Sequence, residues 1–510
     1  MHLGSTSYHI WEYFETLSRK TADATAISSP EGSITFAGLL DAAGKLADAL
    51  RKQGIKSSDL VCHTMTNCID FVTVFLALCK IPAVVTLVSP LYQKQELESI
   101  INNLQPACFI TNNLSRAFQN QDLFESRVLL TPADYPGKAL SILVPKFASS
   151  SSRVGVERAD SYESLLNATA LMKLTSGSTG QPKAVALSDK NILSESRNIV
   201  ETLEVTCDDR ILAAVPLSHS YGFDLGILAM LASGAGLVIR ENFIPRSILR
   251  DLTDERISIF LGVPSMYRFL LETRLDSVPN LSHIRYFLSC TAPLRVEMIH
   301  AFHSRFGAPI CQHYGSSETG AASNHVPAEI IKRPDSVGKA MKNVEIRIVG
   351  PRGESMACGS EGEVAVSGDN VAIGYLMGSP EGKNPLADGT YLTGDIGFLD
   401  KDGFLYLKGR ADHIINVGGL KVAPEEVAMI LEENPAVREV AVIGVKDSTG
   451  EGMVCAAVTL KERATENDLL EFCRGRLAEY KVPRRIVILK EMPRTSSGKI
   501  ILRAKELGLE

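Results

Sequence analysis

The chain has 510 residues, of which 45% are hydrophobic and 22% are charged, and its formal net charge is −6. This length is more than one hydrophobic core covers, so we expect two or more domains, and the composition is ordinary for a globular protein. A negative balance without a basic block argues against nucleic acid as a partner.

The sequence gives no sign of membrane insertion or export. The longest apolar runs, such as Leu225–Leu231, fall well short of the roughly 20 residues that span a bilayer. Residues 1–20 lack an apolar signal core, and the C-terminal "LGLE" is no peroxisomal address. The ten cysteines contain no CxxC pair, which is typical of reduced thiols. We therefore expect a cytoplasmic protein without integral membrane association, as a monomer or a homodimer.

The first 130 residues alternate between helical and strand patterns. Thr35–Gly54 has apolar residues at three- and four-residue steps and ends at a glycine, which predicts a helix. Gln93–Leu104 predicts another helix. Short apolar runs predict strands at Leu60–Met65, Ala83–Leu87 and Cys108–Thr111. This alternation predicts an α/β fold, with a largely parallel sheet covered by helices.

The stretch Leu171–Ile192 predicts two strands joined by a loop of glycines and hydroxyls. The loop consists of Thr175, Ser176, Gly177, Ser178, Thr179 and Gly180, followed by Gln181, Pro182 and Lys183. Glycines let backbone N–H groups approach an anion, hydroxyls donate further hydrogen bonds, and Lys183 adds a positive charge. The spacing is not that of a P-loop, and Ser188 with Asp189 should cap the following helix. Taken alone, the stretch fits a phosphate clamp or an ordinary surface turn.

The α/β pattern continues beyond this loop and then changes. Phe147–Glu157 is rich in serine and predicts a loop. Buried strands are predicted at Ile211–Val215, Leu237–Ile239, Ile259–Gly262 and Tyr286–Ser289. From Val344 to Leu376, short alternating strands and glycine-rich turns predict a β-rich subdomain.

A compact α+β pattern occupies the last hundred residues. Its predicted elements are the strand Ile414–Val417, the helix Pro424–Glu433, the strands Val437–Val445 and Met453–Leu460, the helix Glu466–Leu477 and the strand Arg485–Leu489. This is a plausible size for a separate domain. We predict a large domain over residues 1–410 and a small domain over residues 411–510, with the boundary near Arg410–His413.

Seven motifs together resemble the adenylate-forming superfamily of acyl-CoA synthetases, coumarate-type ligases, luciferases and peptide-synthetase adenylation domains. They occur in the order of that family and cover nearly the whole chain, and the resemblance is closest to the acid–CoA ligase branch. The motifs are "TSGSTGQPK", "PLSHSYG" (Pro216–Gly222), "SCTAPL" (Ser289–Leu294), "QHYGSSET" (Gln312–Thr319), "YLTGD" (Tyr391–Asp395), "GRADHIINVGGLKVAPEE" (Gly409–Glu426) and "PRTSSGK" (Pro493–Lys499).

The resemblance implies a reaction in two halves. A carboxylate attacks the α-phosphorus of ATP and gives acyl-AMP and pyrophosphate, after which a thiol, usually that of coenzyme A, displaces AMP. The implied cofactors are ATP, Mg²⁺ and coenzyme A, and the implied small domain is a mobile lid that turns between the two half-reactions.

The resemblance also implies roles for individual residues. Lys499 would bridge the carboxylate and the α-phosphate as the catalytic lysine. Glu318 would hold Mg²⁺ together with Thr179, and Tyr314 would stack on adenine, near Thr291, Gln312, His313 and Ser317. Asp395 and Arg410 would bind the ribose. His219, a second catalytic candidate, would line the acyl entrance with Tyr221 and Thr291. Gly418 and Gly419 would border the coenzyme A tunnel, and Asp412 would be the hinge.

Some positions depart from the pattern of the family. His313 stands where many relatives have glycine, Thr291 stands where coumarate-type ligases have alanine, and Ser317 replaces a more usual threonine. Asn242 stands where some plant ligases place a lysine that contacts coenzyme A, although Arg240 lies nearby. Three hypotheses stay open: a ligase for a hydrophobic or aromatic acid and coenzyme A, an enzyme that loads a carrier protein or an amine, and a nucleotide-binding scaffold without chemistry.

Overall fold

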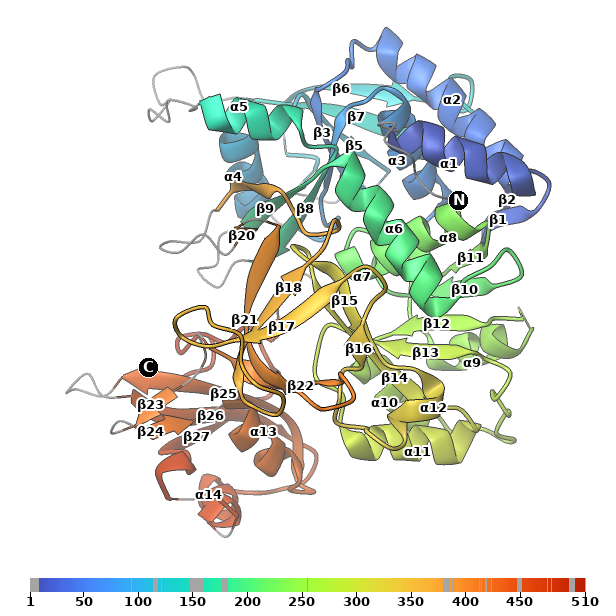
Figure 1. Cartoon of the computed structure of the whole chain (residues 1–510). Coiled ribbons are helices and arrows are strands. Elements are labelled where there is room, and N and C mark those ends of the chain that lie inside the picture. Colours follow the sequence, from blue (N-terminus) through green and yellow to red (C-terminus); the bar gives the residue numbers. More distant parts are fainter. Residues whose placement is uncertain are drawn as a thin grey trace. The chain divides into compact units, whose positions relative to one another are not determined.

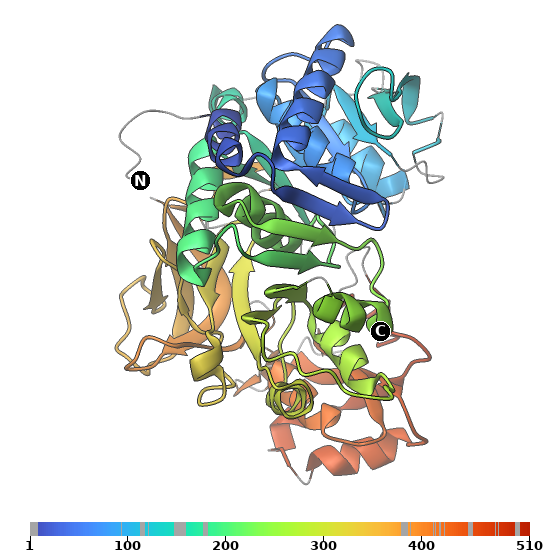
Figure 2. The same ribbon diagram turned by 90° about the vertical axis from the view of Figure 1, so that its right-hand side faces the viewer.

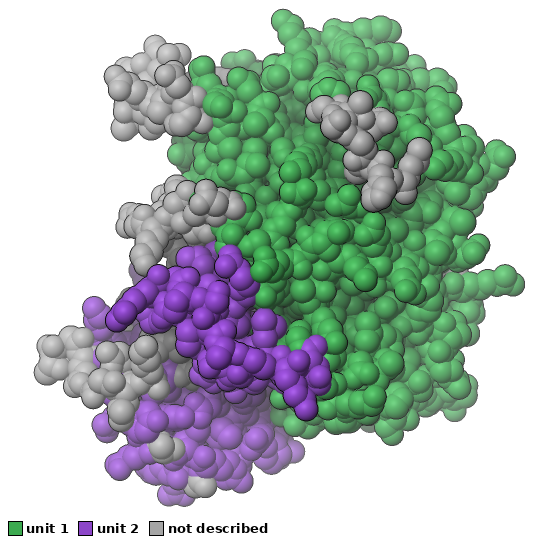
Figure 3. Space-filling model, in the orientation of Figure 1, with its two compact units in different colours: residues 1–346, 366–391, 403–405 green, residues 347–365, 392–402, 406–510 purple. Residues whose placement is uncertain are grey.

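The computed structural model describes residues 9–92, 94–112, 118–120, 122–146, 160–176, 182–254, 256–378, 386–387, 389–411, 413, 415–417, 420–422, 424–446, 452–474, 476–477, 479–494 and 500–509. The chain forms two compact units, coloured separately in Figure 3. The first comprises Met1–Ile346, Val366–Tyr391 and Gly403–Leu405, and the second comprises Arg347–Ala365, Leu392–Asp402 and Tyr406–Glu510. The division into residues 1–410 and 411–510 stays a prediction.

The larger sheet of the first unit has nine strands in the order β16-β15-β14-β13-β12-β10-β11-β1-β2 (Figure 1). Their bounds are β1 Thr25–Ser29, β2 Gly32–Thr35, β10 Arg210–Ala213, β11 Gly236–Ile239, β12 Ile259–Gly262, β13 Tyr286–Ser289, β14 Ile310–Ser316, β15 Gly320–Asn324 and β16 Lys339–Ala340. The strands from β14 to β1 pair in parallel, and the outer pairs are antiparallel. Figure 2 shows the dark-blue β1–β2 hairpin beside the green strands. The parallel centre confirms the predicted α/β class.

Strand β10 ends two residues before its predicted end. The prediction extended it to Val215, but the strand stops at Ala213. The carbonyl oxygen of Val215 accepts a hydrogen bond from Asn67 Nδ2 at 2.8 Å instead of joining a strand ladder. The chain therefore leaves the sheet just before Pro216, where the motif with His219 begins.

The second sheet of the first unit has eight strands in the order β19-β9-β8-β4-β3-β5-β7-β6. Their bounds are β3 Leu60–Thr64, β4 Val84–Leu87, β5 Cys108–Thr111, β6 Phe124–Leu130, β7 Leu140–Pro145, β8 Leu171–Ser176, β9 Pro182–Leu187 and β19 Gly374–Met377. The prediction placed the residues of β19 in the β-rich subdomain, and this was wrong. Tyr375 of β19 pairs with Val185, so this strand extends the sheet of the glycine-rich hairpin.

Helices cover both sheets of the first unit (Figures 1 and 2). They are α1 Ile10–Ser18, η1 Arg19–Thr21, α2 Phe36–Lys52, α3 Ile69–Lys80, α4 Lys94–Leu104, α5 Asp160–Asn167, α6 Asp189–Leu203, α7 Ser220–Gly222, the π-helix η3 Phe223–Leu228, α8 Ala229–Ser233, α9 Pro245–Asp254, α10 Pro264–Glu272, α11 Val296–Phe306 and α12 Pro327–Ile330. The predicted helix at Thr35–Gly54 is α2, whose N-cap is Thr35: its hydroxyl accepts the N–H of Gly38 at 3.1 Å. Phe75 of α3 packs edge-on against Phe223, with ring centroids 4.9 Å apart. This contact fixes the start of η3 in the core.

A five-stranded sheet contains the boundary between the two units. It has the order β17-β18-β21-β20, and β22 pairs with β21. The bounds are β17 Glu345–Val349, β18 Gly362–Ser367, β20 Leu386–Ala387, β21 Thr390–Leu399 and β22 Leu405–Arg410. The predicted β-rich pattern of Val344–Leu376 is confirmed for β17 and β18, and β20, β21 and β22 lie beyond the predicted stretch.

The last hundred residues fold around a small core of their own. The strands are β23 Ile415–Val417, β24 Leu420–Val422, β25 Val437–Lys446, β26 Gly452–Leu460 and β27 Arg485–Ile488, and the helices are α13 Pro424–Glu432, α14 Glu466–Arg474 and η4 Glu479–Lys481. Val427 and Leu431 on one face of α13 are buried in this core with Val440 and Leu469. The predicted α+β pattern is therefore confirmed.

Candidate active site

The glycine-rich loop is anchored at both ends by an antiparallel hairpin. The β8–β9 pairing runs from Leu171 opposite Leu187 to Ser176 opposite Pro182, with Thr175 opposite Lys183. Because β4 and β19 flank this hairpin, it lies inside the sheet, and the ends of the loop are fixed. The two predicted strands are confirmed, but they extend over Thr175, Ser176, Pro182 and Lys183, which the prediction placed in the loop. Outside the described part of the chain lie Gly177, Ser178, Thr179, Gly180 and Gln181.

The helix that follows the hairpin has Ser188 as its N-cap, as predicted, but the capping partner is Asn191 and not Asp189, which is the first helical residue. The Ser188 hydroxyl accepts the N–H of Asn191 at 3.3 Å, and Asn191 Oδ1 accepts the N–H of Ser188 at 2.8 Å. The two contacts form a reciprocal capping box at the start of α6. Asn191 Nδ2 also donates to the carbonyl oxygens of Asp369 and Val371 at 2.8 Å, which fixes α6 against the segment before β19.

The segment with His219 and Tyr221 forms a sharp turn into η3. Tyr221 is buried, and its hydroxyl donates to the carbonyl oxygen of Leu288 at 2.9 Å. Burial raises the pKa of Tyr221 well above its usual value, so its phenol stays neutral. His219 is the N-cap of α7, with Nδ1 3.4 Å from the Tyr221 nitrogen. A Cβ on Gly222 would collide with the Pro216 carbonyl oxygen, so this turn requires glycine.

Strand β14 brings His313 next to Tyr221. Their ring centroids lie 6.0 Å apart. Asn324 Nδ2 donates to the His325 carbonyl oxygen, so Asn324 Oδ1 faces His313 Nδ1 at 3.0 Å and accepts a hydrogen bond from its N–H. Burial lowers the pKa of His313 to about 4, which keeps the ring neutral near pH 7. His313 is therefore an uncharged ring with a fixed orientation.

The other predicted residues of β14 and of the turn that follows have different environments. Gln312 donates through Nε2 to the carbonyl oxygens of Pro334 and Ser336, at 2.9 and 2.8 Å. Its side chain therefore braces the loop behind the strand. Tyr314 is half-buried on the same strand. The hydroxyl of Ser317 lies 2.7 Å from that of Ser220, which joins this motif to the His219 segment.

Glu318, the predicted metal ligand, is a buried carboxylate. Its side chain accepts a hydrogen bond from the Tyr375 hydroxyl at 3.0 Å, and Tyr375 lies 3.5 Å from the Tyr391 hydroxyl. Among the described residues, no three His, Cys, Asp or Glu side chains gather as a metal-binding set. Mg²⁺ in nucleotide sites is commonly held by one or two carboxylates, the phosphates and water, and a single buried carboxylate fits that role.

Thr291 has an unusual backbone. It is exposed, and its φ is 75°, in the left-handed region that β-branched residues rarely adopt. Such strain persists where the surrounding structure enforces it, and it is most frequent at functional sites. The turn lies directly after β13, at the carboxyl end of the parallel strands, which is where ligands bind in open α/β sheets.

Asp395 and Arg410 come together within the second unit. The guanidinium Nη1 lies 3.6 Å from Asp395 Oδ1 and donates to the Thr393 carbonyl oxygen at 3.3 Å. Gly394 between them has a φ of 75°, and a Cβ there would lie 2.8 Å from Arg410 Nη2. The strands β21 and β22 thus present a carboxylate beside a cation, an arrangement able to bind vicinal hydroxyls.

Several predicted residues lie outside the part of the chain that the structure describes. They are Asp412, Gly418, Gly419 and Lys499. Val417 and Leu420, on either side of the two glycines, pair across the β23–β24 hairpin. The roles of these four residues stay predictions.

The sequence reasoning missed four residues around the turn of Glu318. Tyr375 contacts Glu318 directly, while Lys173, Glu195 and Asn370 are buried polar residues nearby. Lys173 could have been noticed, since a lysine inside the apolar strand "LMKL" requires a buried counter-ion. For Glu195 and Asn370 the sequence alone carries no comparable signal.

Two family models match most of the chain. The family described as AMP-binding enzyme matches residues 14–376, and the AMP-binding enzyme C-terminal domain matches residues 426–499. An oxalate–CoA ligase of Arabidopsis thaliana is 32% identical over 95% of this chain and 96% of its own length.

Two solved structures have the same fold. An o-succinylbenzoate–coenzyme A synthetase of Bacillus subtilis, in complex with ATP and magnesium, matches with a TM-score of 0.80 at 22% identity, over 97% of this chain and 99% of its own. An amide bond synthetase of Marinactinospora thermotolerans matches with a TM-score of 0.77 at 25% identity, over 96% and 98%. The chain belongs to the AMP-binding enzyme family.

Proposed function

We propose that this protein is an AMP-forming acid–thiol ligase. It activates a carboxylic acid with ATP, releases pyrophosphate and transfers the acyl group to a thiol, for which coenzyme A is the first candidate. The observation that carries this proposal lies in the first unit: the Ser220–Ser317 contact at 2.7 Å joins the His219 turn to the turn of the buried Glu318 carboxylate. Both turns face the carboxyl ends of the parallel strands.

In the first half-reaction the carboxylate of the acid must approach the negatively charged phosphates of ATP. Positively charged groups must therefore offset the repulsion between them. The hydroxyls and backbone N–H groups of residues 175–180 bind the β- and γ-phosphates with Lys183, and Glu318 holds Mg²⁺ with Thr179. When bound, Mg²⁺ neutralises charge that develops on the phosphates. Lys499 holds the carboxylate against the α-phosphate. Tyr314 stacks on adenine, and Asp395 and Arg410 bind the ribose.

The proposed acid enters between His219, Tyr221, Thr291 and His313. The uncharged rings of Tyr221 and His313, whose centroids lie 6.0 Å apart, would border this entrance. Neutral aromatic side chains at the entrance suit a hydrophobic or aromatic acid. The similarity to an oxalate–CoA ligase adds small diacids to the candidates.

For coenzyme A as acceptor, a surface hollow of the first unit offers two guanidinium groups. The hollow has a volume of about 410 Å³, and its lining includes Arg240 and Arg250 together with the carboxylates of Glu241 and Asp251. Arg240 Nε is held by Asp251 at 2.7 Å, and Arg250 donates to the Ser247 hydroxyl at 3.4 Å. A guanidinium group here suits a phosphate of the nucleotide part of coenzyme A. Gly418 and Gly419 would border the pantetheine arm.

One structural similarity supports a second class of acyl acceptor. The amide bond synthetase matched above has the same fold over nearly the full chain. An amine, or the thiol of a carrier protein, would then replace coenzyme A after the same adenylation.

The deciding experiment separates the two half-reactions. Purified protein is assayed for acid-dependent ATP–pyrophosphate exchange with a panel of aromatic acids, fatty acids and diacids. The best acid is then supplied with coenzyme A, a phosphopantetheinylated carrier protein or an amine, and products are identified by mass spectrometry. We expect exchange with one acid class and an acyl-CoA product. Exchange with an amide product would assign the second acceptor class, and a lack of exchange with every acid would refute the ligase.

The cell compartment and the oligomeric state complete the proposal. All ten cysteines, each of which the structure describes, are free thiols, which supports a reducing compartment such as the cytosol. In the described part of the chain, no helix is long and apolar enough to cross a membrane. We propose a monomer or a homodimer, which light scattering would distinguish.

A further inference from the structure

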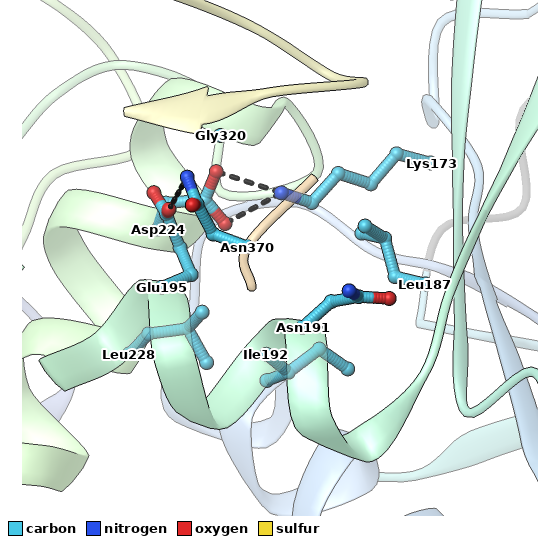
Figure 4. Close-up of a pocket in the computed structure, with 9 residues that line it drawn as sticks. All are labelled: Lys173, Leu187, Asn191, Ile192, Glu195, Asp224, Leu228, Gly320 and Asn370. Carbon is cyan, nitrogen blue, oxygen red and sulfur yellow. Dashed lines mark hydrogen bonds and ion pairs between the residues drawn. The ribbon is translucent and has the colours of Figure 1, made fainter. Parts of the chain in front are cut away.

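A buried ion pair joins the glycine-rich hairpin to η3. Lys173 on β8 and Asp224 in η3 each have 5% of their side chain exposed, and Lys173 Nζ lies 2.7 Å from both carboxylate oxygens (Figure 4). Lys173 precedes Thr175 by two residues, and Asp224 follows Tyr221 by three. The pair thus connects the hairpin of the phosphate loop to the His219–Tyr221 turn from inside the core.

Lys173 and Asp224 border a small cavity in the core. The carboxyl group of Glu195 on α6 is also buried and borders this cavity (Figure 4). Its Oε1 accepts the N–H of Ala321 at 2.7 Å, and its Oε2 accepts Asn370 Nδ2 at 3.2 Å. A Cβ on Gly320 would collide with this carboxylate, so the close approach requires glycine at that position. Burial, and then the nearby Asp224 carboxylate, raises the pKa of Glu195 to about 8.

These contacts and two further hydrogen bonds hold the part of the turn from Glu318 to Ala321. Asn370 Nδ2 also donates to the Thr319 carbonyl oxygen at 2.6 Å. The N–H of Ala372 donates to the Glu318 carbonyl oxygen at 2.8 Å. The backbone from Glu318 to Ala321 is therefore hydrogen-bonded to Ala372, Asn370 and Glu195. All these residues belong to the first unit.

We propose that Glu195 is a positioning residue, which with Asn370 fixes the 318–321 turn and so aims the Glu318 carboxylate at the nucleotide-bound metal. This inference rests on the proposed function, since it presupposes that Glu318 binds Mg²⁺. A carboxyl group is costly to bury even when it is neutral, and an apolar side chain would fill the core at lower cost. The directed hydrogen bonds to Ala321 and Asn370 are what an apolar residue would not supply.

The test compares three variants of the full chain. Glu195→Ala removes both contacts, whereas Glu195→Gln keeps an oxygen able to accept the Ala321 N–H. Asp209→Ala is the matched control, because Asp209 is equally buried but bonds Thr206 and Ser258, away from the 318–321 turn. Each variant is titrated with Mg²⁺ in ATP–pyrophosphate exchange, with the acid saturating.

We expect Glu195→Ala to raise the Mg²⁺ concentration for half-maximal exchange by about 10-fold, the lower end of the loss seen when a direct hydrogen-bond partner of a metal ligand is removed, because Glu195 acts on Glu318 through the backbone of the turn. Glu195→Gln should recover most of this loss, and the KM for the acid should change little. Asp209→Ala should lower stability without a shift in the Mg²⁺ requirement. An unchanged Mg²⁺ requirement in folded Glu195→Ala, or an equal shift in the control, would overturn the positioning role.

A readout independent of catalysis separates this inference from the proposed function. Amide hydrogen exchange of peptides covering residues 314–324 should accelerate in Glu195→Ala and remain near the wild-type rate in Asp209→Ala. If the wild type catalyses no exchange with any acid, the ligase is refuted, while hydrogen exchange still decides whether Glu195 holds the turn. If Glu195→Ala does not fold, Asn370→Ala, which removes the donor to Thr319, is expected to give the same two effects, and its failure to do so contradicts the proposal.

Discussion

Lys499 is the residue on which the proposed chemistry depends most. Lys499→Ala should lower acid-dependent ATP–pyrophosphate exchange by about 10²–10³-fold, because a charge that stabilises the transition state is lost. Thioester formation from supplied acyl-AMP should survive, since that step does not need the lysine at the α-phosphate. Both rates are measured on the same preparation. Retained exchange, or equal loss of both steps, would contradict the assigned role.

His63 on β3 predicts an acid-sensitive stability. It is fully buried, with Nε2 donating to the Phe71 carbonyl oxygen at 3.0 Å, and burial lowers its pKa to about 4. The unfolded chain, with a histidine pKa near 6.5, binds the proton more readily. Its contribution to stability is therefore complete above about pH 6.5 and is lost as the pH falls toward 4.

This loss is measurable by urea unfolding at pH 7.5 and 5.0. The free energy of unfolding should fall by about 2 kcal/mol from His63 alone, according to the linkage of pKa and stability. His63→Gln should be less stable at pH 7.5, because the ring contact with Phe71 is lost, but should depend less on pH. Equal pH dependence in the two proteins would contradict the assignment.

For single residues, the sequence predicts a chemical role better than it predicts which side chains will surround the residue. The resemblance assigned Glu318 a role from its motif, but it did not reveal that Tyr375 is its hydrogen-bond partner. Glu195 looks like any polar residue on a helix, and only the packing of α6 against β15 makes it a buried carboxylate. Burial of a single polar side chain depends on tertiary contacts, which periodicity does not resolve.

We expect a single methyl group added at Gly222 to displace the His219 turn. Gly222→Ala would place a Cβ against the Pro216 carbonyl oxygen, which is backbone and has little freedom to move. The turn should shift with His219 and Tyr221, so kcat/KM for the acid should fall by more than 10-fold. The matched control is Gly226→Ala in η3, where the nearest atom to the added Cβ is a leucine methyl at 3.6 Å. Steady-state kinetics should leave Gly226→Ala closer to wild type, and the reverse order would contradict the steric argument.

Elements with a strong local pattern were predicted well. Strands β5, β12 and β13 have the predicted bounds, and α2 differs from its prediction by its cap residues. Prediction failed where distant segments interact. Asn67 binds the Val215 carbonyl oxygen just beyond the end of β10, and β19 pairs with β9 although nearly two hundred residues separate them in the sequence. The π-helical geometry of Phe223–Leu228 was not predicted either, because the same apolar run fits an ordinary helix.

The proposed change of lid orientation belongs to the whole molecule. Asp412→Pro would restrict the backbone at the predicted hinge, and hinge residues must absorb large changes in φ and ψ. One half-reaction should fall by at least about 10-fold more than the other. The variant is assayed for pyrophosphate exchange and, separately, for thioester formation from acyl-AMP. Equal damage to both would argue against a hinge at this residue.

The fold class of the whole molecule was predicted, but the order of the strands in its sheets was not. The α/β class, the β-rich middle and the small α+β end follow from patterns that each segment carries itself. The order of the strands in the two large sheets does not, because a parallel neighbour is chosen by packing between distant segments.

The pairing of β1 with β11 constrains how the protein can be made. Ile27 needs Leu237 beside it, so this edge of the sheet stays incomplete while the ribosome translates the intervening residues. At about 5–20 residues per second, the nascent chain waits on the order of 10–40 s with its first hairpin unpaired. An isolated two-stranded hairpin is marginally stable and exposes a strand edge. The newly made amino-terminal segment therefore exposes this strand edge until residue 239 has left the ribosome.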